Sequence, residues 1–289
     1  MADTGPEQAS SPYMAMFEGF RQELDEHHDR RERIIKASRD ITAASKKIIF
    51  TLQRVRTLGA SIPPFAVKSN TPYWEIIEKQ YKSIAADLQG INAFRYERQI
   101  TGGNQEFIES LTFQHYLESQ TLITYDDAKA RVARLSGEGG AVSLSPEDYI
   151  LGVFDMIGEV MRFSITAMAT NGKVPTGKQT KAAGPPSKEE ESEQPADKMD
   201  IDEPPFVPSE KLQPRSVLDD LREIRLQLEM FNPPKSKFGD DVEKKMVVMQ
   251  QCVDKVEKAL YSLTVRGSER PKGWVPDVQE DRRSAVESY

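Results

Sequence analysis

The chain has 289 residues, of which 38% are hydrophobic and 29% are charged, and its formal net charge is −7. This share of hydrophobic residues is low for a compact domain. It indicates that part of the chain is extended or unfolded. The sequence contains no apolar stretch of about 18 residues, and its first residues lack the apolar core of a signal peptide. These features exclude a membrane-spanning or secreted protein. They predict that the protein is located in the cytoplasm or the nucleus.

The negative charge is concentrated in one segment. Residues 188–203 hold eight acids against two lysines, so this segment carries −6 and the other 273 residues together carry −1. A general polyanion-binding surface is therefore not encoded. Local basic patches, such as the one that Lys46, Lys47, Arg54 and Arg56 could form, remain an alternative.

The first predicted element is a very long helix. Residues 1–13 are small and polar and are expected to be disordered. From Met14, apolar side chains recur in a helical rhythm at Phe17, Phe20, Leu24, Ile34, Ile41, Ile48, Leu52 and Val55. A helix of this extent is about 60 Å long. Its apolar seam must therefore pack against several partners, in the same chain or in another subunit.

Helical periodicity continues through most of the chain, and no segment shows convincing two-residue alternation. Gly102 and Gly103 are expected to end the second helix, whereas Gly152 and Gly158 should let another helix approach closely. Ser145 is a typical N-cap, since proline and an acid follow it. The predicted helices after the first span about 72–99, a segment around 106–119, 126–135, 145–170, a segment after 210, and 240–266.

These elements predict an all-α protein of about seven helices in two sequence blocks. Residues 14–170 would form the first part of the helical domain and residues 210–275 the second part. Between them, residues 171–209 are rich in Gly, Pro, Lys and Glu and predict a disordered acidic insertion. Residues 276–289 are expected to be a flexible C-terminus.

Two pairs of acids have the spacing that one helix face requires. Glu106 and Glu109 lie three residues apart, and Asp155 and Glu159 lie four apart. Such pairs bring their Cβ atoms to about 5–6 Å. Two such helices side by side would form a cup of oxygens suited to Mg²⁺ and to metal-assisted hydrolysis of a phosphodiester. The alternative is that they are ordinary solvated carboxylates in a highly charged chain.

Four further features have two interpretations each. Arg162, one turn after Glu159, could hold a phosphate oxygen or simply neutralise that glutamate. His115 could support the carboxylates, or it could be a packing residue. The single cysteine, Cys252, could be a reactive thiol, but it is expected to be a small buried hydrophobe. Some aromatic side chains could stack on bases, but their helical spacing also suits a core: Trp74, Phe113, Tyr116 and Tyr149.

Four separated blocks of the sequence resemble the translin family, and within it the branch of catalytic partners of translin. They are FEGFRQELDEHHDRRERIIKASRDITAASKKIIFTLQRV, QEFIESLTFQHYLES, PEDYILGVFDMIGEVMRF and VDKVEKALYSLTVRGSERPK. The blocks occur in the family's order and extend from about Phe17 to Lys272. The exception is 171–209, which looks like an insertion.

The resemblance implies a translin-like bundle that assembles with translin into a hollow hetero-oligomer. It also implies an endoribonuclease that depends on Mg²⁺, with Mn²⁺ as a substitute, and that cuts single-stranded RNA such as small-RNA passenger-strand fragments or transfer-RNA processing intermediates. The family's acids correspond to Glu106, Glu109 and Asp155, with Glu159 as a fourth metal residue. A rival hypothesis is a non-catalytic helical scaffold, or a nucleic-acid-binding partner of translin, in which these acids are structural.

Overall fold

The computed structural model describes residue 11 and residues 13–177 and 215–266. Within these residues the chain forms eight α-helices, two short 3-10 helices and no β-strand, which confirms the predicted all-α class. The α-helices are α1 Met14–Leu52, α2 Pro64–Ile84, α3 Ile91–Arg95, α4 Glu97–Ser119, α5 Tyr125–Leu135, α6 Pro146–Asn171, α7 Val217–Glu229 and α8 Lys237–Arg266. No helix among them is long and apolar enough to cross a membrane.

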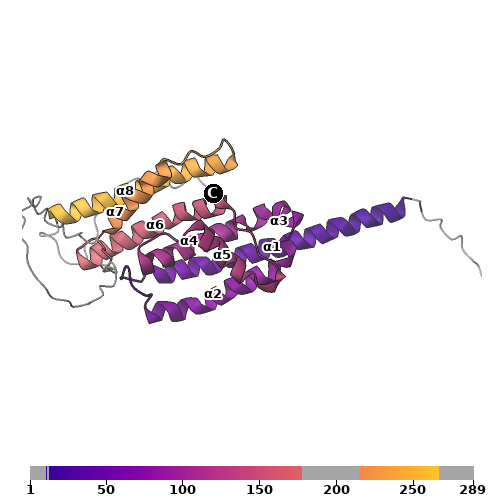
Figure 1. Cartoon of the computed structure of the whole chain (residues 1–289), viewed down its shortest axis with the longest axis horizontal. Coiled ribbons are helices and arrows are strands. Elements are labelled where there is room, and N and C mark those ends of the chain that lie inside the picture. Colours follow the sequence, from indigo (N-terminus) through magenta and orange to yellow (C-terminus); the bar gives the residue numbers. More distant parts are fainter. Residues whose placement is uncertain (1–10, 12, 178–214, 267–289) are drawn as a thin grey trace, which may run out of the picture.

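The main helices pack in the order α2, α1, α4, α6, α8 and α7, from one side of the bundle to the other. Figure 1 shows α7 and α8 along one edge and α2 along the opposite edge, with α4 and α6 between them. This order places α4 directly against α6, and α6 against α8. Helices α4, α6 and α8, which line the candidate site, are therefore neighbours in this order.

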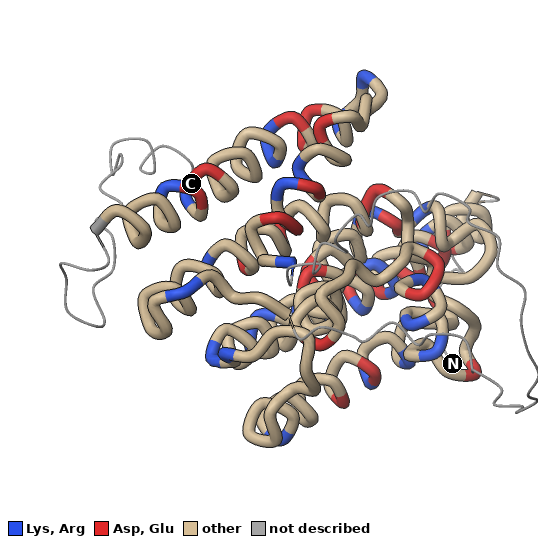
Figure 2. Tube along the Cα trace, turned by 60° about the vertical axis from the view of Figure 1, so that its left-hand side comes forward, with Lys and Arg blue, Asp and Glu red and all other residues tan. Residues whose placement is uncertain are grey.

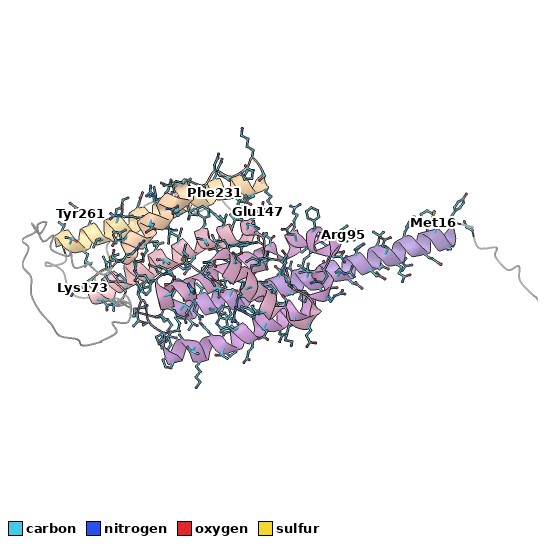
Figure 3. The ribbon with its side chains drawn as sticks, in the orientation of Figure 1. Met16, Arg95, Glu147, Lys173, Phe231 and Tyr261 are labelled. Atoms are coloured by element: carbon cyan, nitrogen blue, oxygen red, sulfur yellow. The ribbon has the colours of Figure 1, made fainter. Side chains whose placement is uncertain are left out.

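Only the second half of α1 is part of the core. Ile34, Ile41 and Ile48 recur every seven residues and are fully buried. In the first half, Phe17, Phe20 and other apolar side chains are more than half exposed, and this part of α1 projects beyond the bundle with Met16 near its far end (Figures 1 and 3). Among the described residues, the predicted seam therefore packs against other helices only along its second half.

The region predicted as one helix over 72–99 is divided differently. Helix α2 begins at Pro64, where the fixed φ angle of proline suits the first helical turn, and it ends at Ile84. Gly90 then adopts a φ of 57°, in the left-handed region that glycine tolerates, so the chain turns before the short α3.

The prediction that Gly102 and Gly103 end a helix is wrong, because α4 runs through both. A Cβ atom on Gly103 would lie 3.0 Å from the Ser38 hydroxyl oxygen of α1. Here glycine allows two helices to pack closely, and this packing offsets its poor helix propensity.

Helix α6 begins with the cap predicted at Ser145, and α7 begins with a serine cap that was not predicted. The Ser145 and Ser216 hydroxyls accept hydrogen bonds from the backbone N–H groups of Asp148 and Asp219. Helix α6 ends at Gly172, which has a φ of 65°.

The two ends of the expected insertion meet. The Val217 N–H donates to the Pro175 carbonyl over 3.0 Å, and Thr176 forms an antiparallel bridge with Ser216. The chain therefore leaves and re-enters the bundle at nearly the same point. The expected disorder of residues 1–10, 178–209 and 276–289 falls outside the described residues.

Candidate functional site

The two predicted acid pairs lie at one pocket between neighbouring helices. Glu106 and Glu109 extend from α4, and Asp155 and Glu159 extend from α6. All four line the same open pocket of about 510 Å³. The structure thus brings together carboxylates that are separated by about 50 residues of sequence.

Close packing of α4 on α6 fixes how these pairs face each other. A Cβ atom on Gly152 would lie 2.8 Å from the Ile108 Cβ, so only glycine allows this approach. Four residues earlier on the same helix, the buried Asp148 carboxylate accepts hydrogen bonds of 3.1 Å from the Asn104 and Gln105 amides. These contacts set the register that places the second acid pair opposite the first.

Gly158 does not have the role predicted for it. Nothing would lie within 4 Å of a Cβ atom at this position, so no helix approaches it. It lines the carboxylate pocket instead. The missing side chain helps to leave space beside Asp155 and Glu159.

Glu159 is the most buried of the four acids, with its side chain 8% exposed. The Arg162 guanidinium pairs with it at 2.9 Å, and the Gln53 amide donates to its carboxylate over 2.7 Å. Gln53 also donates to the Glu159 backbone carbonyl over 2.9 Å, which anchors the end of α1 to α6. Arg162 therefore neutralises Glu159 here, and its 66% exposed side chain still lines the pocket.

Two of the other acids also have cationic partners. Lys46 of α1 lies 3.8 Å from Glu106, and Lys245 of α8 forms an ion pair with Asp155. The Glu109 carboxylate has no hydrogen bond or ion pair within the described part of the chain. It is the acid of the pocket without a direct ion pair among the described residues, although the charge of Lys245 lowers its pKa from a longer distance.

Burial and mutual repulsion make the α4 pair hard to ionise. Burial raises the pKa of Glu106, and the nearby Asp155 and Glu159 oppose the lowering effect of Lys46. Burial raises the pKa of Glu109 to about 8, and the charges of Glu106, Asp155 and Glu159 add to this effect. A cation bound here would remove the repulsion and favour both ionised forms.

The chemistry of the donor set suits a hard divalent cation, because it offers only oxygens and leaves Glu109 uncompensated. As arranged in the described residues, however, no three His, Cys, Asp or Glu side chains are placed to hold a metal ion. The Lys245 ammonium already contacts the Asp155 carboxylate that such an ion would ligate, and Lys46 lies 3.8 Å from Glu106. Metal binding therefore requires these side chains to move.

The remaining sequence candidates lie elsewhere. His115 bonds to the Thr121 hydroxyl at 3.2 Å and does not line the pocket. The aromatic side chains belong to the core: Trp74 packs edge-on against Phe107, and Phe113 and Tyr116 are buried. Cys252 is buried as predicted, which raises the pKa of its thiol, although it also borders the carboxylate pocket.

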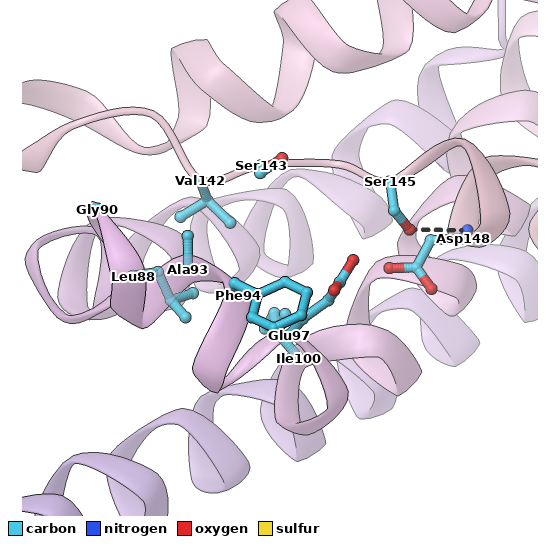
Figure 4. Close-up of a pocket in the computed structure, with 10 residues that line it drawn as sticks. All are labelled: Leu88, Gly90, Ala93, Phe94, Glu97, Ile100, Val142, Ser143, Ser145 and Asp148. Atoms are coloured by element: carbon cyan, nitrogen blue, oxygen red, sulfur yellow. Dashed lines mark hydrogen bonds between the residues drawn. The ribbon is translucent and has the colours of Figure 1, made fainter.

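A smaller cavity of about 260 Å³ lies near the start of α6 (Figure 4). Its walls include Phe94, Ile100 and Val142, and the Glu97 and Asp148 carboxylates point toward it. Since Asp148 already accepts hydrogen bonds from two amides, it ties α4 to α6.

The site also contains basic residues that the sequence did not single out. Lys244, Lys245 and Lys255 of α8 line the pocket opposite the acids. Acidic and basic positions are mixed along the described helices (Figure 2). No spacing rule could have found these lysines, because only the packing of α8 on α6 brings them to the site.

Comparisons with known proteins agree with this architecture. A crystal structure of apo-NeC3PO matches 84% of this chain and 96% of its own, with a TM-score of 0.51 and 13% sequence identity, so this likeness concerns the fold alone. Among curated proteins, translin-associated protein X of Rattus norvegicus is 30% identical and that of Pongo abelii 31% identical, each over 93% of this chain and 84% of the relative. The Schizosaccharomyces pombe homolog is 35% identical over 52% of this chain and 61% of its own length.

The sequence profile of the translin family matches residues 29–267. This stretch includes the second half of α1, both acid pairs and α8. The chain therefore belongs to the translin family.

Proposed function

We propose that the chain is the catalytic subunit of a translin-containing, Mg²⁺-dependent endoribonuclease that cleaves single-stranded RNA. The observation that carries this proposal is the pocket lined by Glu106, Glu109, Asp155 and Glu159, in which Glu109 has no direct ion pair among the described residues and its pKa is raised. Family membership supports the same function. The RNA targets would be small-RNA passenger-strand fragments or transfer-RNA processing intermediates, in the cytoplasm or the nucleus.

The residues of the pocket would have distinct tasks. Glu106, Glu109 and Asp155 would hold the Mg²⁺, or Mn²⁺ in its place, with Glu159 as a fourth ligand or as an orienting group. The chemistry that a bound cation supplies is activation of water and stabilisation of charge on phosphate oxygens. Glu109 would release the proton that its raised pKa retains in the free protein.

Arg162 provides a further contact for substrate. Its guanidinium is 66% exposed at the pocket and can turn from Glu159 to a phosphate oxygen with the same fork of donors. No base-reading side chain is required at such a site, because a backbone phosphate is common to all sequences. Cleavage should therefore favour flexible single strands and show little sequence preference.

The exposed half of α1 supports a role as a partner of translin. Within the described part of the chain, an apolar surface stays exposed on α1; it consists of Tyr13, Met16, Phe17, Phe20 and Leu24. The curated relatives carry the name translin-associated protein X, which states an association of those proteins with translin. Burial of this surface by a second subunit would remove a large apolar area from water.

A cleavage assay on the complex co-expressed with translin tests the catalytic proposal. The wild-type complex should cut a labelled single-stranded RNA with Mg²⁺ and stop when the metal is chelated. Glu109→Gln should reduce the rate at least about a hundredfold, since it removes a charged oxygen donor. Glu118→Gln, on the exposed side of the same helix, is the matched control and should leave the rate unchanged. Full activity of Glu109→Gln would refute the mechanism.

One observation favours the rival function, a non-catalytic scaffold or nucleic-acid-binding partner of translin. Three of the four acids already have a cationic partner, as structural carboxylates usually do. A binding module of this kind would keep its RNA affinity after chelation and would cut nothing in any metal. The cleavage assay therefore separates the two functions.

A further inference from the structure

Lys245 links α8 to the carboxylate pocket. Its ammonium group forms an ion pair with Asp155 of α6, and the two side chains are 26% and 36% exposed. We propose that Lys245 is an internal countercharge that a divalent cation must displace from Asp155, so that this lysine sets the cation concentration at which the pocket fills. The inference rests on the proposed function, because it takes Asp155 as a metal-binding residue.

The competition follows from the shared oxygen. The Lys245 ammonium contacts Oδ1 of Asp155, and a divalent ion ligated by Asp155 would compete for the same carboxylate. An ammonium and a divalent ion on one carboxylate also repel each other, more strongly in a half-buried pocket than in water. The lysine must therefore leave before, or as, the cation binds.

The other cations of the pocket are less suited to this role. Lys46 is 65% exposed and only reaches 3.8 Å from Glu106, so water screens that pair. Arg162 lies one turn from Glu159 on the same helix, and Gln53 shares that carboxylate. Lys245 is the most buried of the three cations, and unlike Arg162 it comes from a different helix than the acid it pairs with.

Release of Lys245 need not disturb the fold. Buried apolar side chains of α8 hold this helix against the bundle. They include Val242, Met249, Val253 and Val256. These contacts persist when the ammonium group turns toward solvent. In the metal-free protein the lysine instead lowers the repulsion among the four acids, which keeps the pocket assembled before a cation arrives.

The adjacent lysine provides a matched control. Lys244 lines the same pocket, but its ion pair is with Asp241 of its own helix at 4.0 Å, and its side chain is 78% exposed. Lys244→Met and Lys245→Met therefore change the net charge equally, and only the second removes the group that contacts Asp155. Lys245→Arg retains the charge at the same position.

The test is a direct titration with Mn²⁺ of the full-length protein, which is purified together with its partner. Free Mn²⁺ is measured by electron paramagnetic resonance. Lys245→Met should bind Mn²⁺ about tenfold more tightly than wild type, the size expected when a partly exposed unit charge next to the ion is removed. Lys245→Arg and Lys244→Met should remain within about twofold to threefold of wild type. Circular dichroism and the thermal midpoint show whether each variant is folded.

The outcomes separate this inference from the proposed function. Tighter binding by Lys245→Met alone supports it. Equal Mn²⁺ affinities for wild type, Lys245→Met and Lys244→Met would overturn it and leave the metal site intact. An equal gain in both methionine variants would also overturn it, because long-range charge would then explain the effect. If wild type and Lys245→Arg bind no Mn²⁺ at this pocket, the proposed function fails as well.

Discussion

Replacing Glu109 with glutamine should make the metal-free protein more stable while it removes metal binding. Burial and neighbouring acids raise the pKa of this carboxyl from 4.5 to about 8. At about pH 7 the folded protein must hold a proton that the unfolded chain has released, which costs about 3 kcal/mol. Partial exposure to solvent reduces this to about 2 kcal/mol. Glutamine has the shape of the neutral acid and carries no such cost.

The effect has a defined direction with pH. Below about pH 4.5 the Glu109 carboxyl is protonated in both states, so it has no pH-dependent effect on stability. As pH rises from about 4.5 to about 8, the unfolded chain loses its proton first, and the contribution of Glu109 to stability falls. The advantage of Glu109→Gln should therefore be near zero at about pH 4.5 and reach its full size by about pH 8.

Urea unfolding in a chelating buffer, followed by circular dichroism across this pH range, measures the difference. Adding Mg²⁺ should then stabilise wild type but not Glu109→Gln, because a ligand that binds only the folded state stabilises it. Glu118→Gln is the control, since Glu118 is exposed on the same helix. A Glu109→Gln variant that is less stable than wild type at about pH 8 would refute the electrostatic account of the pocket.

Four further predictions concern helix packing at two glycines, the segment 178–214 and the exposed half of α1. Gly152→Ala should lower the free energy of unfolding by about 2 kcal/mol, because the new Cβ would lie 2.8 Å from the Ile108 Cβ. Gly158→Ala meets nothing within 4 Å and should raise the free energy of unfolding by up to about 1 kcal/mol through helix propensity, so an equal loss in both variants would contradict the packing argument. Replacing residues 178–214 by a short Gly-Ser linker should change the free energy of unfolding by no more than about 1 kcal/mol, since the ends of the segment already meet, and a large loss would show that the segment contributes to the core. Phe20→Glu should weaken assembly with translin in size-exclusion chromatography without changing the melting temperature of the isolated chain, and normal assembly would exclude this surface as the interface.

The helices and the acid pairs could be predicted from the sequence because both depend on local spacing. Ile34, Ile41 and Ile48 recur at a helical interval, and the structure buries all three. Glu106 and Glu109 could likewise be assigned to one helix face from their separation alone.

Features that depend on tertiary packing could not be predicted in the same way. Gly103 has the local signature of a helix end, but it lies within α4 because α1 packs against it. Gly158 has the signature of a close helix contact, yet it faces open space. Lys245 reaches Asp155 across 90 residues of sequence, and only the packing of α8 on α6 makes that pair.

The central claim is that acids from α4 and α6 share one divalent cation. Anomalous diffraction from crystals of the full complex grown with Mn²⁺ tests it most directly, because the anomalous signal locates the ion itself. We predict a peak in the pocket within ligand distance, about 2.0–2.6 Å, of oxygens from both helices, including Glu109 and Asp155. A pocket without a peak at saturating Mn²⁺, with Lys245 still paired to Asp155, would contradict the claim.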